Sequence, residues 1–493
     1  MRRFLLVLVA IFSLILVAGC SCQVDKGDKV FEDLTEVVKT GEKDGVAIEK
    51  VQITVSVTSG VVSDSLTPLI PLFEAEYPHV GITLKTISGG YTELRKTNIL
   101  EIQSYQAPTV TLGYPDHFAE YYSAGAMINL SNFIAGPNGY TQAELDDFIP
   151  SYLAEGKGFD DANPNDYYSL PFNKSTEVLV YNKTILEAAM AKDATIKVPK
   201  TWAEVKSVSD KLLALGAAGE LDGIITVAAG EYKISEHINR GTFYTFAYDS
   251  SANAFITFTR QVKSTYTERA NNEQGYLAFD TPANVANLKY FQDENTAKRF
   301  AVAETFGSNY ASDAFKRGQV LFTVGSSAGI KYNEPEGNKF EIGISTVPYF
   351  TEDAKYVIQQ GTNIAMLAQS TNLERAAAWL FIKFLLQPEV TAKFAMASGG
   401  YLPVRLSAYE TEAYQEYLDN PPLEKRSYSK AANLALQYRA QGYQFFVDPA
   451  FVGSSKIRDE VGSALVSVIV NKAEVKKRLE DAYATLGKAY QKW

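Results

Sequence analysis

The sequence predicts an α/β protein with two or more domains, and two observations support this. Apolar and polar residues alternate from Val51 to Val57 and again over 80–84, while apolar residues recur with helical spacing over 66–73. The order strand, helix, strand indicates a βαβ unit, although Pro68 and Pro71 leave the first turns of the helix undecided. The chain has 493 residues, more than one hydrophobic core usually supports.

The N-terminus predicts a secretory signal. Arg2 and Arg3 precede an apolar run over 4–17, and small residues follow it, which is the order of a signal peptide. The run is shorter than the ~20 residues that a membrane span needs. Val17-Ala18-Gly19-Cys20 resembles the bacterial lipobox, so the resemblance implies a lipoprotein signal peptide over 1–19 and lipid attachment at Cys20. Acyl chains there would hold the protein at a membrane surface.

Composition excludes several classes of function. The net charge of −10 argues against nucleic acid as a partner, because phosphate binding needs a basic surface. The only cysteines are Cys20 and Cys22, so no disulfide is expected in the folded body. The three histidines are widely separated, and no spacing typical of a metal site is visible, so neither metal nor cofactor is expected. Residues 20–50 are polar with mixed charges and are expected to form a tether.

The stretch 167–182 is the most informative part of the chain. Pro171 holds the residue before it extended and cannot donate to a strand ladder. Phe172, Asn173, Ser175 and Thr176 then present an aromatic face, an amide and two hydroxyls within five positions, a mixture that suits a neutral polyhydroxylated ligand. An ordinary strand start with an Asx or Ser/Thr turn explains this segment about equally well.

The sequence Leu-Pro-Phe-Asn-Lys-Ser-Thr-Glu-Val-Leu-Val-Tyr-Asn-Lys over 170–183 resembles the extracellular solute-binding proteins of family 1, which serve ABC importers. The similar branch is the one that binds sugars and glycerol-3-phosphate. Further similar blocks lie at 199–204, 314–327 and 398–405. The resemblance implies a two-lobed periplasmic-binding-protein-like fold, type II as in maltose-binding protein, with a hinge between the lobes and a ligand cleft.

The same resemblance implies lobe boundaries and site residues. Residues 51–168 and 322–358 are expected to form the N-terminal lobe, and residues 169–321 and 359–493 the C-terminal lobe. The residues expected to contact the ligand are Tyr91, Asn173, Ser175, Thr176, Tyr232, Ser326, Ser327, Gly361 and Tyr401. Residues 251–277 match no pattern of the family.

The chain also departs from the phosphate-binding members of that branch. They carry an arginine near the C-terminal loop, but residues 446–452 contain none here and Arg458 lies several residues further on. Thr92 stands where that branch has an acidic residue. Because a buried anion favours a bidentate arginine, a neutral mono- or oligosaccharide is expected rather than glycerol-3-phosphate or a glycerophosphodiester.

The predicted function is therefore ligand binding and not catalysis. The resemblance implies a lipid-anchored, monomeric protein on the outer face of the cytoplasmic membrane, which closes around a carbohydrate and delivers it to an ABC transporter permease. Two other classes stay open: a surface-anchored glycan hydrolase, for which no nucleophile motif is visible, and an adhesin.

Overall fold

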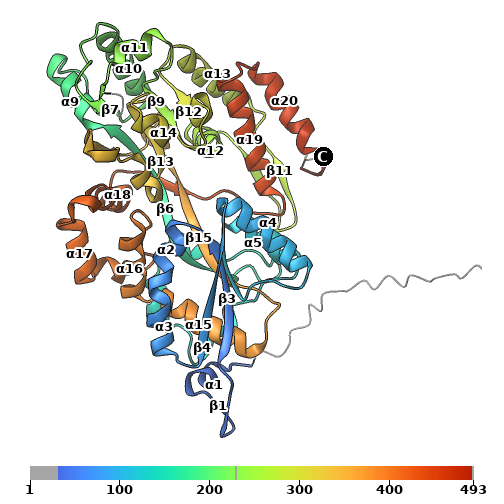
Figure 1. Ribbon diagram of the computed structural model, residues 1–493. Coiled ribbons are helices and arrows are strands. Elements are labelled where there is room, and N and C mark those ends of the chain that lie inside the picture. The colour runs from blue at the N-terminus through green and yellow to red at the C-terminus, as the bar shows by residue number, and fades with distance from the viewer. Residues whose placement is uncertain (1–31, 228–229, 491–493) are drawn as a thin grey trace, which may run out of the picture. The chain divides into compact units, whose positions relative to one another are not determined.

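The computed structural model describes residues 32–227 and 230–490 (Figure 1). The predicted signal peptide, the lipid attachment at Cys20 and the first part of the tether lie outside these residues. Within them, no helix combines the length and the apolar character that crossing a membrane requires.

Residues 32–50 were expected to belong to the tether, and the structure corrects this. They form helix α1 (Thr35–Thr40) and a small hairpin of β1 (Glu42–Lys43) and β2 (Val46–Ala47). Leu34 and Val38 are buried, and α1 contacts α15 (Asn372–Leu385). Leu34 and Val38 are one helical turn apart, so they share one face and bury it against the body.

A ten-stranded mixed sheet runs through the described chain in the order β12-β9-β13-β6-β15-β5-β3-β4, with β14 paired to β6 and β16 paired to β15 (Figure 1). Its strands are β3 (Val51–Thr58), β4 (Val80–Ile87), β5 (Val110–Gly113), β6 (Leu170–Asn182), β9 (Phe246–Tyr248), β12 (Ala301–Val302), β13 (Phe322–Ser326), β14 (Ile342–Ser345), β15 (Tyr356–Met366) and β16 (Gln444–Phe446).

The predicted βαβ unit is confirmed. Strand β3 pairs in parallel with β4 from Val51 to Thr58, and the connection contains α2 (Val61–Leu66), a 3₁₀ turn over 67–69 and α3 (Ile70–Glu76). Pro68 and Pro71 each stand in the first turn of one of these pieces, where the missing N–H costs nothing. The prolines therefore divide the helix without abolishing it.

Two large hydrophobic cores divide the body. The first gathers residues of β3, β4, β5 and α15, and the second gathers residues of β9, β12, β13 and the C-terminal helices. Strands β6 and β15 belong to both cores: Leu170 and Ile364 are buried in the first, Val180 and Val357 in the second. These two long strands therefore join the two halves of the body.

The cores differ from the expected lobe boundaries in the middle of the chain. Residues 322–358 were expected in the N-terminal lobe, but β13 and β14 pair with the C-terminal half of β6 and pack in the second core. Residues 364–404 were expected in the C-terminal lobe, but they contribute to the first core. The sequence patterns predict a strand but do not show which half of β6 the strand pairs with. They therefore could not show to which core these segments belong.

Buried polar residues occupy the middle of both joining strands. On β6 these are Asn173, Lys174, Ser175, Thr176 and Glu177, and on β15 Gln359, Thr362 and Asn363, none more than 5% exposed. Burying a polar group costs free energy unless the group is hydrogen-bonded. We call residues 173–177 and 359–363 the crossing segments.

Candidate functional site

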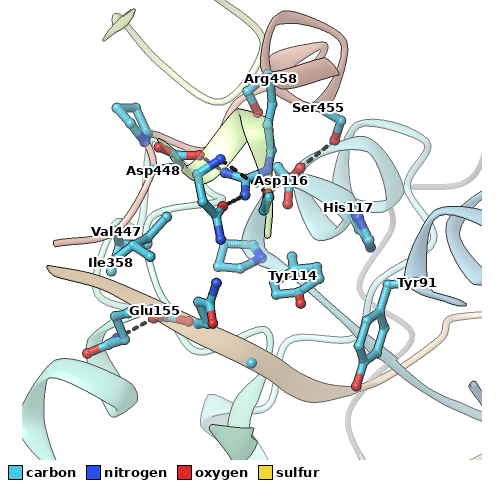
Figure 2. A pocket seen from close by; sticks show the side chains of 18 of the residues that line it. Tyr91, Tyr114, Asp116, His117, Glu155, Ile358, Val447, Asp448, Ser455 and Arg458 are labelled. Carbon is cyan, nitrogen blue, oxygen red and sulfur yellow. Dashed lines mark hydrogen bonds and ion pairs between the residues drawn. The ribbon is translucent and has the colours of Figure 1, made fainter. Parts of the chain in front are cut away.

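A cavity of about 260 Å³ lies beside the crossing segments, between elements of the two halves (Figure 2). First-turn residues of four helices line it: α4 (Gly90–Gln103) and α5 (Pro115–Ser123) from the first half, α12 (Ser251–Gln261) and α19 (Ser454–Ile469) from the second. Residues 358–361 of β15 and the loop 447–449 complete it. We call this cavity the cleft.

Three tyrosines give the cleft its apolar surface. Tyr91 and Tyr114 come from the first half and Tyr266 from the second. The rings of Tyr91 and Tyr114 meet edge to face with centroids 5.1 Å apart. Aromatic faces of this kind cover the C–H surface of a sugar ring.

The ionisable side chains of the cleft are mostly acidic. Two guanidinium groups, Arg95 and Arg458, face four carboxylates, from Asp116, Glu155, Asp448 and Asp459. Both guanidinium groups are already paired. Arg95 donates to both oxygens of Glu120, each at 2.7 Å, and Arg458 forms an ion pair with Asp448 (Figure 2).

Glu155 is held from behind by a buried lysine. Lys174 Nζ lies 2.5 Å from Glu155 Oε2, and the two side chains are 0% and 5% exposed. Gln359 donates its amide N–H to the other carboxylate oxygen of Glu155 and to the carbonyl of Ser151. Glu155 is therefore fixed in place from both crossing segments.

Several buried acceptors of the cleft have no hydrogen-bond partner among the described residues. They include Gln359 Oε1, Gln360 Oε1 and Asp448 Oδ1. The amide of Gln359 cannot turn to satisfy its own oxygen, because its nitrogen is occupied by Glu155 and Ser151. Unpaired buried acceptors are costly, so these three side chains keep unmet hydrogen-bonding capacity beside the cleft, although the oxygens themselves have almost no accessible surface.

Burial sets the charge state of His117 and influences that of Asp448. Burial lowers the pKa of His117 to about 4, so its imidazole is neutral at neutral pH. Burial raises the pKa of Asp448, and the charge of Arg458 opposes that effect. Asp116 accepts a hydrogen bond of 2.5 Å from Ser455 Oγ across the cleft (Figure 2).

Of the nine predicted ligand contacts, Tyr91 and Gly361 line the cleft. Asn173 and Tyr401 lie behind Tyr91: Asn173 Nδ2 donates to Tyr91 Oη at 2.6 Å, and the hydroxyls of Tyr91 and Tyr401 are 3.2 Å apart. Tyr401 is 9% exposed. These two residues therefore position Tyr91 and do not themselves line the cleft.

The predicted serines and Thr176 join the strands near the crossing segments. Ser326 Oγ donates to Ser175 Oγ at 3.3 Å, and Ser327 Oγ donates to the carbonyl of Gly400 at 2.9 Å. Thr176 Oγ1 donates to the carbonyl of Ile358 at 3.0 Å. These contacts satisfy buried polar groups within the body and place these residues outside the lining of the cleft.

Tyr232 lies in a different place from the one expected. Its side chain is 2% exposed in the second core, its hydroxyl donates to the carbonyl of Gly318, and its ring stacks on His237. The aromatic residue that the second half contributes to the cleft is Tyr266.

Arg458 and its partners were not expected in the site. The absence of an arginine from 446–452 did not exclude a guanidinium from the cleft, because α19 begins at Ser454 and places Arg458 one turn into the helix, facing it. The sequence signal that could have located Arg458 is the helix start after Gly453, at Ser454 and Ser455. In sequence, the adjacent Asp116 and His117 suggest acid–base chemistry and give no sign of a ligand cleft.

Comparisons with known proteins agree with this arrangement. The family described as "Bacterial extracellular solute-binding protein" matches residues 70–422. The sn-glycerol-3-phosphate-binding periplasmic protein UgpB of Yersinia enterocolitica is 26% identical over 340 residues, covering 68% of this chain and 70% of the relative. UgpB of Salmonella typhimurium is 24% identical over 363 residues, 72% of this chain and 71% of that protein.

Solved structures share the fold. UgpB from Mycobacterium tuberculosis, in complex with glycerophosphocholine, superposes with a TM-score of 0.69 at 20% identity, covering 88% of this chain and 97% of its own. The GacH receptor of Streptomyces glaucescens, solved unliganded and with acarbose, gives a TM-score of 0.66 at 19% identity and covers 90% and 100%. These matches confirm the expected two-lobed α/β fold.

Proposed function

The chain belongs to the bacterial extracellular solute-binding proteins, and from this premise we propose that it captures a neutral carbohydrate, a mono- or oligosaccharide. As a solute-binding protein of an ABC importer, it would deliver this ligand to the permease. The excess of carboxylates over guanidinium groups in the cleft is the observation that carries the proposal. A sugar hydroxyl can donate to a carboxylate, whereas an ionised phosphate has only acceptors to offer.

The charges of the cleft support a neutral ligand in the same way. Four carboxylates outnumber two guanidinium groups that are both paired. An anion entering this cleft would have to break an ion pair or lie against uncompensated carboxylates, and like charges in a confined site cost free energy. Tyrosine faces add the apolar contact that a sugar ring needs.

The second candidate is glycerol-3-phosphate or a glycerophosphodiester. It is favoured by the names of the curated relatives, which are glycerol-3-phosphate-binding proteins, and by the presence of Arg458 in the cleft. No specific observation favours a hydrolase or an adhesin over these two candidates.

The remaining parts of the proposal concern place and mechanism. We infer lipid attachment at Cys20, a monomer, and a position on the outer face of the cytoplasmic membrane. The two halves would close around the ligand by bending at the crossing segments, since a ligand that contacts both halves favours the closed state. In this role the protein binds its ligand without converting it.

Thermal unfolding with candidate ligands tests the proposal. The protein would begin at Gln23, so that α1 stays on the first core, and be heated with neutral mono- and oligosaccharides, glycerol and glycerol-3-phosphate. A ligand at a hundredfold excess over its Kd adds about 2.7 kcal/mol to the free energy of unfolding. We expect a neutral saccharide to raise the melting temperature and Tyr91→Ala to abolish that rise.

Tyr310→Ala is the matched control, because Tyr310 is an exposed tyrosine that does not line the cleft. It should leave the saccharide effect intact. Stabilisation by glycerol-3-phosphate alone would replace the carbohydrate proposal with the second candidate. Chemical conversion of a stabilising glycan would point to a hydrolase instead.

A further inference from the structure

Arg458 stands at a place that would suit an anion. It lies in the first turns of α19, and first-turn residues of α5 and α12 line the same cleft. Helix N-termini carry partial positive charge and unpaired N–H groups, which favour anions. A guanidinium at this position adds a full charge and a planar set of donors that matches a phosphate.

The guanidinium is nevertheless occupied from within the protein. One of its terminal nitrogens pairs with Asp448 Oδ2 and the other donates to Asn253 Oδ1. Asn253 cannot turn away, because its amide nitrogen donates to Glu177 Oε1 at 2.8 Å. The acceptors on Arg458 are therefore held in position by the body of the protein.

Asp448 binds Arg458 through one of its two carboxylate oxygens. Oδ1 has no hydrogen-bond partner among the described residues, while Oδ2 binds Arg458 (Figure 2). Because Oδ2 of Asp448 already pairs with Arg458, a ligand phosphate would have to compete with this carboxylate for the guanidinium. Arg260, from α12, and Asp116, from α5, are the other charged groups that influence the pKa of the Asp448 carboxyl.

We infer that Asp448 determines the specificity of the cleft: its carboxylate takes the position of a ligand anion on Arg458 and thereby excludes phosphorylated ligands. The inference rests on the proposed function, because it concerns the choice between neutral and phosphorylated ligands at the same site. It explains how a cleft that contains an arginine can still select a neutral sugar.

The test compares the affinities of glycerol and sn-glycerol-3-phosphate by calorimetry in wild type and Asp448→Asn. Asparagine keeps the shape of the side chain but removes its charge, so Arg458 becomes available to a phosphate. Because hydrogen bonds to charged groups are worth about ten- to a hundredfold in affinity, we expect glycerol-3-phosphate to bind Asp448→Asn at least tenfold more tightly than wild type. The gain should shrink as salt is added.

Two further variants separate release of Arg458 from a simple loss of negative charge. Asp459→Asn removes one carboxylate of the same cleft that forms no ion pair with Arg458 among the described residues, so its gain should be several times smaller. The double variant Asp448→Asn/Arg458→Gln should lose the gain altogether. An equal gain in Asp459→Asn, or a gain that survives in the double variant, would overturn the inference.

These measurements distinguish a failure of the inference from a failure of the carbohydrate proposal. Saccharide binding by wild type with no phosphate gain in Asp448→Asn would refute the inference alone. A phosphate gain in a protein that binds no neutral saccharide would refute the carbohydrate proposal alone. If wild type already binds glycerol-3-phosphate more than tenfold more tightly than glycerol, the inference is wrong whatever the variants do, including the case in which Asp448→Asn does not fold.

Discussion

Glu177 is a buried glutamate of the crossing segments whose surroundings raise the pKa of its carboxyl. It is 1% exposed in β6, its carboxylate accepts hydrogen bonds from Tyr248 and Asn253, and no lysine or arginine among the described residues pairs with it directly. Burial raises its pKa to about 7. The side chain of Asn253 bonds both Glu177 and Arg458 of the cleft. The charge of Glu177 is therefore linked to the site through one intervening side chain.

This pKa makes stability depend on pH in a defined direction. The folded state binds the proton of Glu177 more tightly than the unfolded chain, whose pKa is near 4.5, so the contribution of Glu177 to the free energy of unfolding falls as pH rises from 4.5 to about 7. The shift is worth about 3 kcal/mol. We expect Glu177→Gln, which cannot ionise, to gain that amount relative to wild type across this window in chemical denaturation.

Glu336→Gln serves as the control for this measurement, because Glu336 is exposed and its replacement should keep the wild-type dependence. A stability difference between wild type and Glu177→Gln that stays constant from about pH 4.5 to 7.5 would show that Glu177 does not titrate in the folded protein as its burial implies.

Single site residues were only partly predictable from sequence. Tyr91 and Gly361 were expected from the resemblance to a family, and both line the cleft, Tyr91 from α4 and Gly361 from β15. Tyr401 and Tyr232 sit in matching segments too, but side-chain direction and hydroxyl partners decide whether a tyrosine faces ligand or core. Arg458 was missed because its place depends on the residue at which α19 begins.

At the scale of elements, β15 depends on one glycine. Gly361 has φ +89°, and the pairing of β15 with β6 shifts register just after it, between Thr362 and Asn363. A Cβ on Gly361 would overlap the carbonyl oxygen of Asn173. The two joining strands therefore approach each other at a position that only glycine permits.

Gly361→Ala should consequently destabilise the protein. Both the positive φ and the overlap with Asn173 must be relieved, which costs about 2–4 kcal/mol in the free energy of unfolding. Denaturant unfolding measures this directly. Gly329→Ala is the matched control, because a Cβ at Gly329 would meet no atom within 4 Å, so this substitution should change little. Equal stability of the two variants would refute the strain at Gly361.

Local signals identified elements well where side chains cap or alternate. Thr201 and Glu204, three residues apart, form a capping box at the start of α10 (Trp202–Ala217), and Thr281 and Thr371 cap helices α13 (Pro282–Thr296) and α15. Long-range pairing was less predictable: nothing in the pattern of 322–326 shows that β13 joins β6 and not the first half of the sheet.

Residues 251–277, which matched no family pattern, form α12 and the hairpin of β10 (Thr267–Arg269) and β11 (Gly275–Leu277).

At the scale of the whole body, this hairpin connects the two halves. Its base belongs to the second core through Tyr266 and Leu277, and its tip reaches residues of the first half. Arg269 donates to the carbonyl of Gly158 at 2.5 Å, and Ser123 Oγ donates to Glu273 at 2.8 Å. Such contacts exist only while the halves are together, so the hairpin favours the closed arrangement.

Removing the tip contacts should therefore loosen ligand binding without touching the cleft. Arg269 and Glu273 are exposed and do not line it, so Arg269→Ala/Glu273→Ala removes two bridging side chains and leaves the ligand contacts in place. Because exposed polar pairs are worth up to about 1 kcal/mol each, we expect a three- to tenfold increase in the rate of ligand dissociation, measured by stopped-flow fluorescence.

Arg240→Ala is the appropriate comparison for this double variant. Arg240 is an exposed arginine whose ion pair with Glu236 lies within α11 (Ile234–Asn239) and its last turn, so its loss breaks no contact between the halves. It should dissociate ligand at the wild-type rate.

Small-angle scattering of the ligand-free double variant Arg269→Ala/Glu273→Ala should also show a larger radius of gyration, because the open arrangement gains population when bridging contacts are lost. If dissociation and radius both match wild type, the hairpin tip does not stabilise closure, and the closed arrangement depends on contacts inside the cleft such as Ser455 with Asp116.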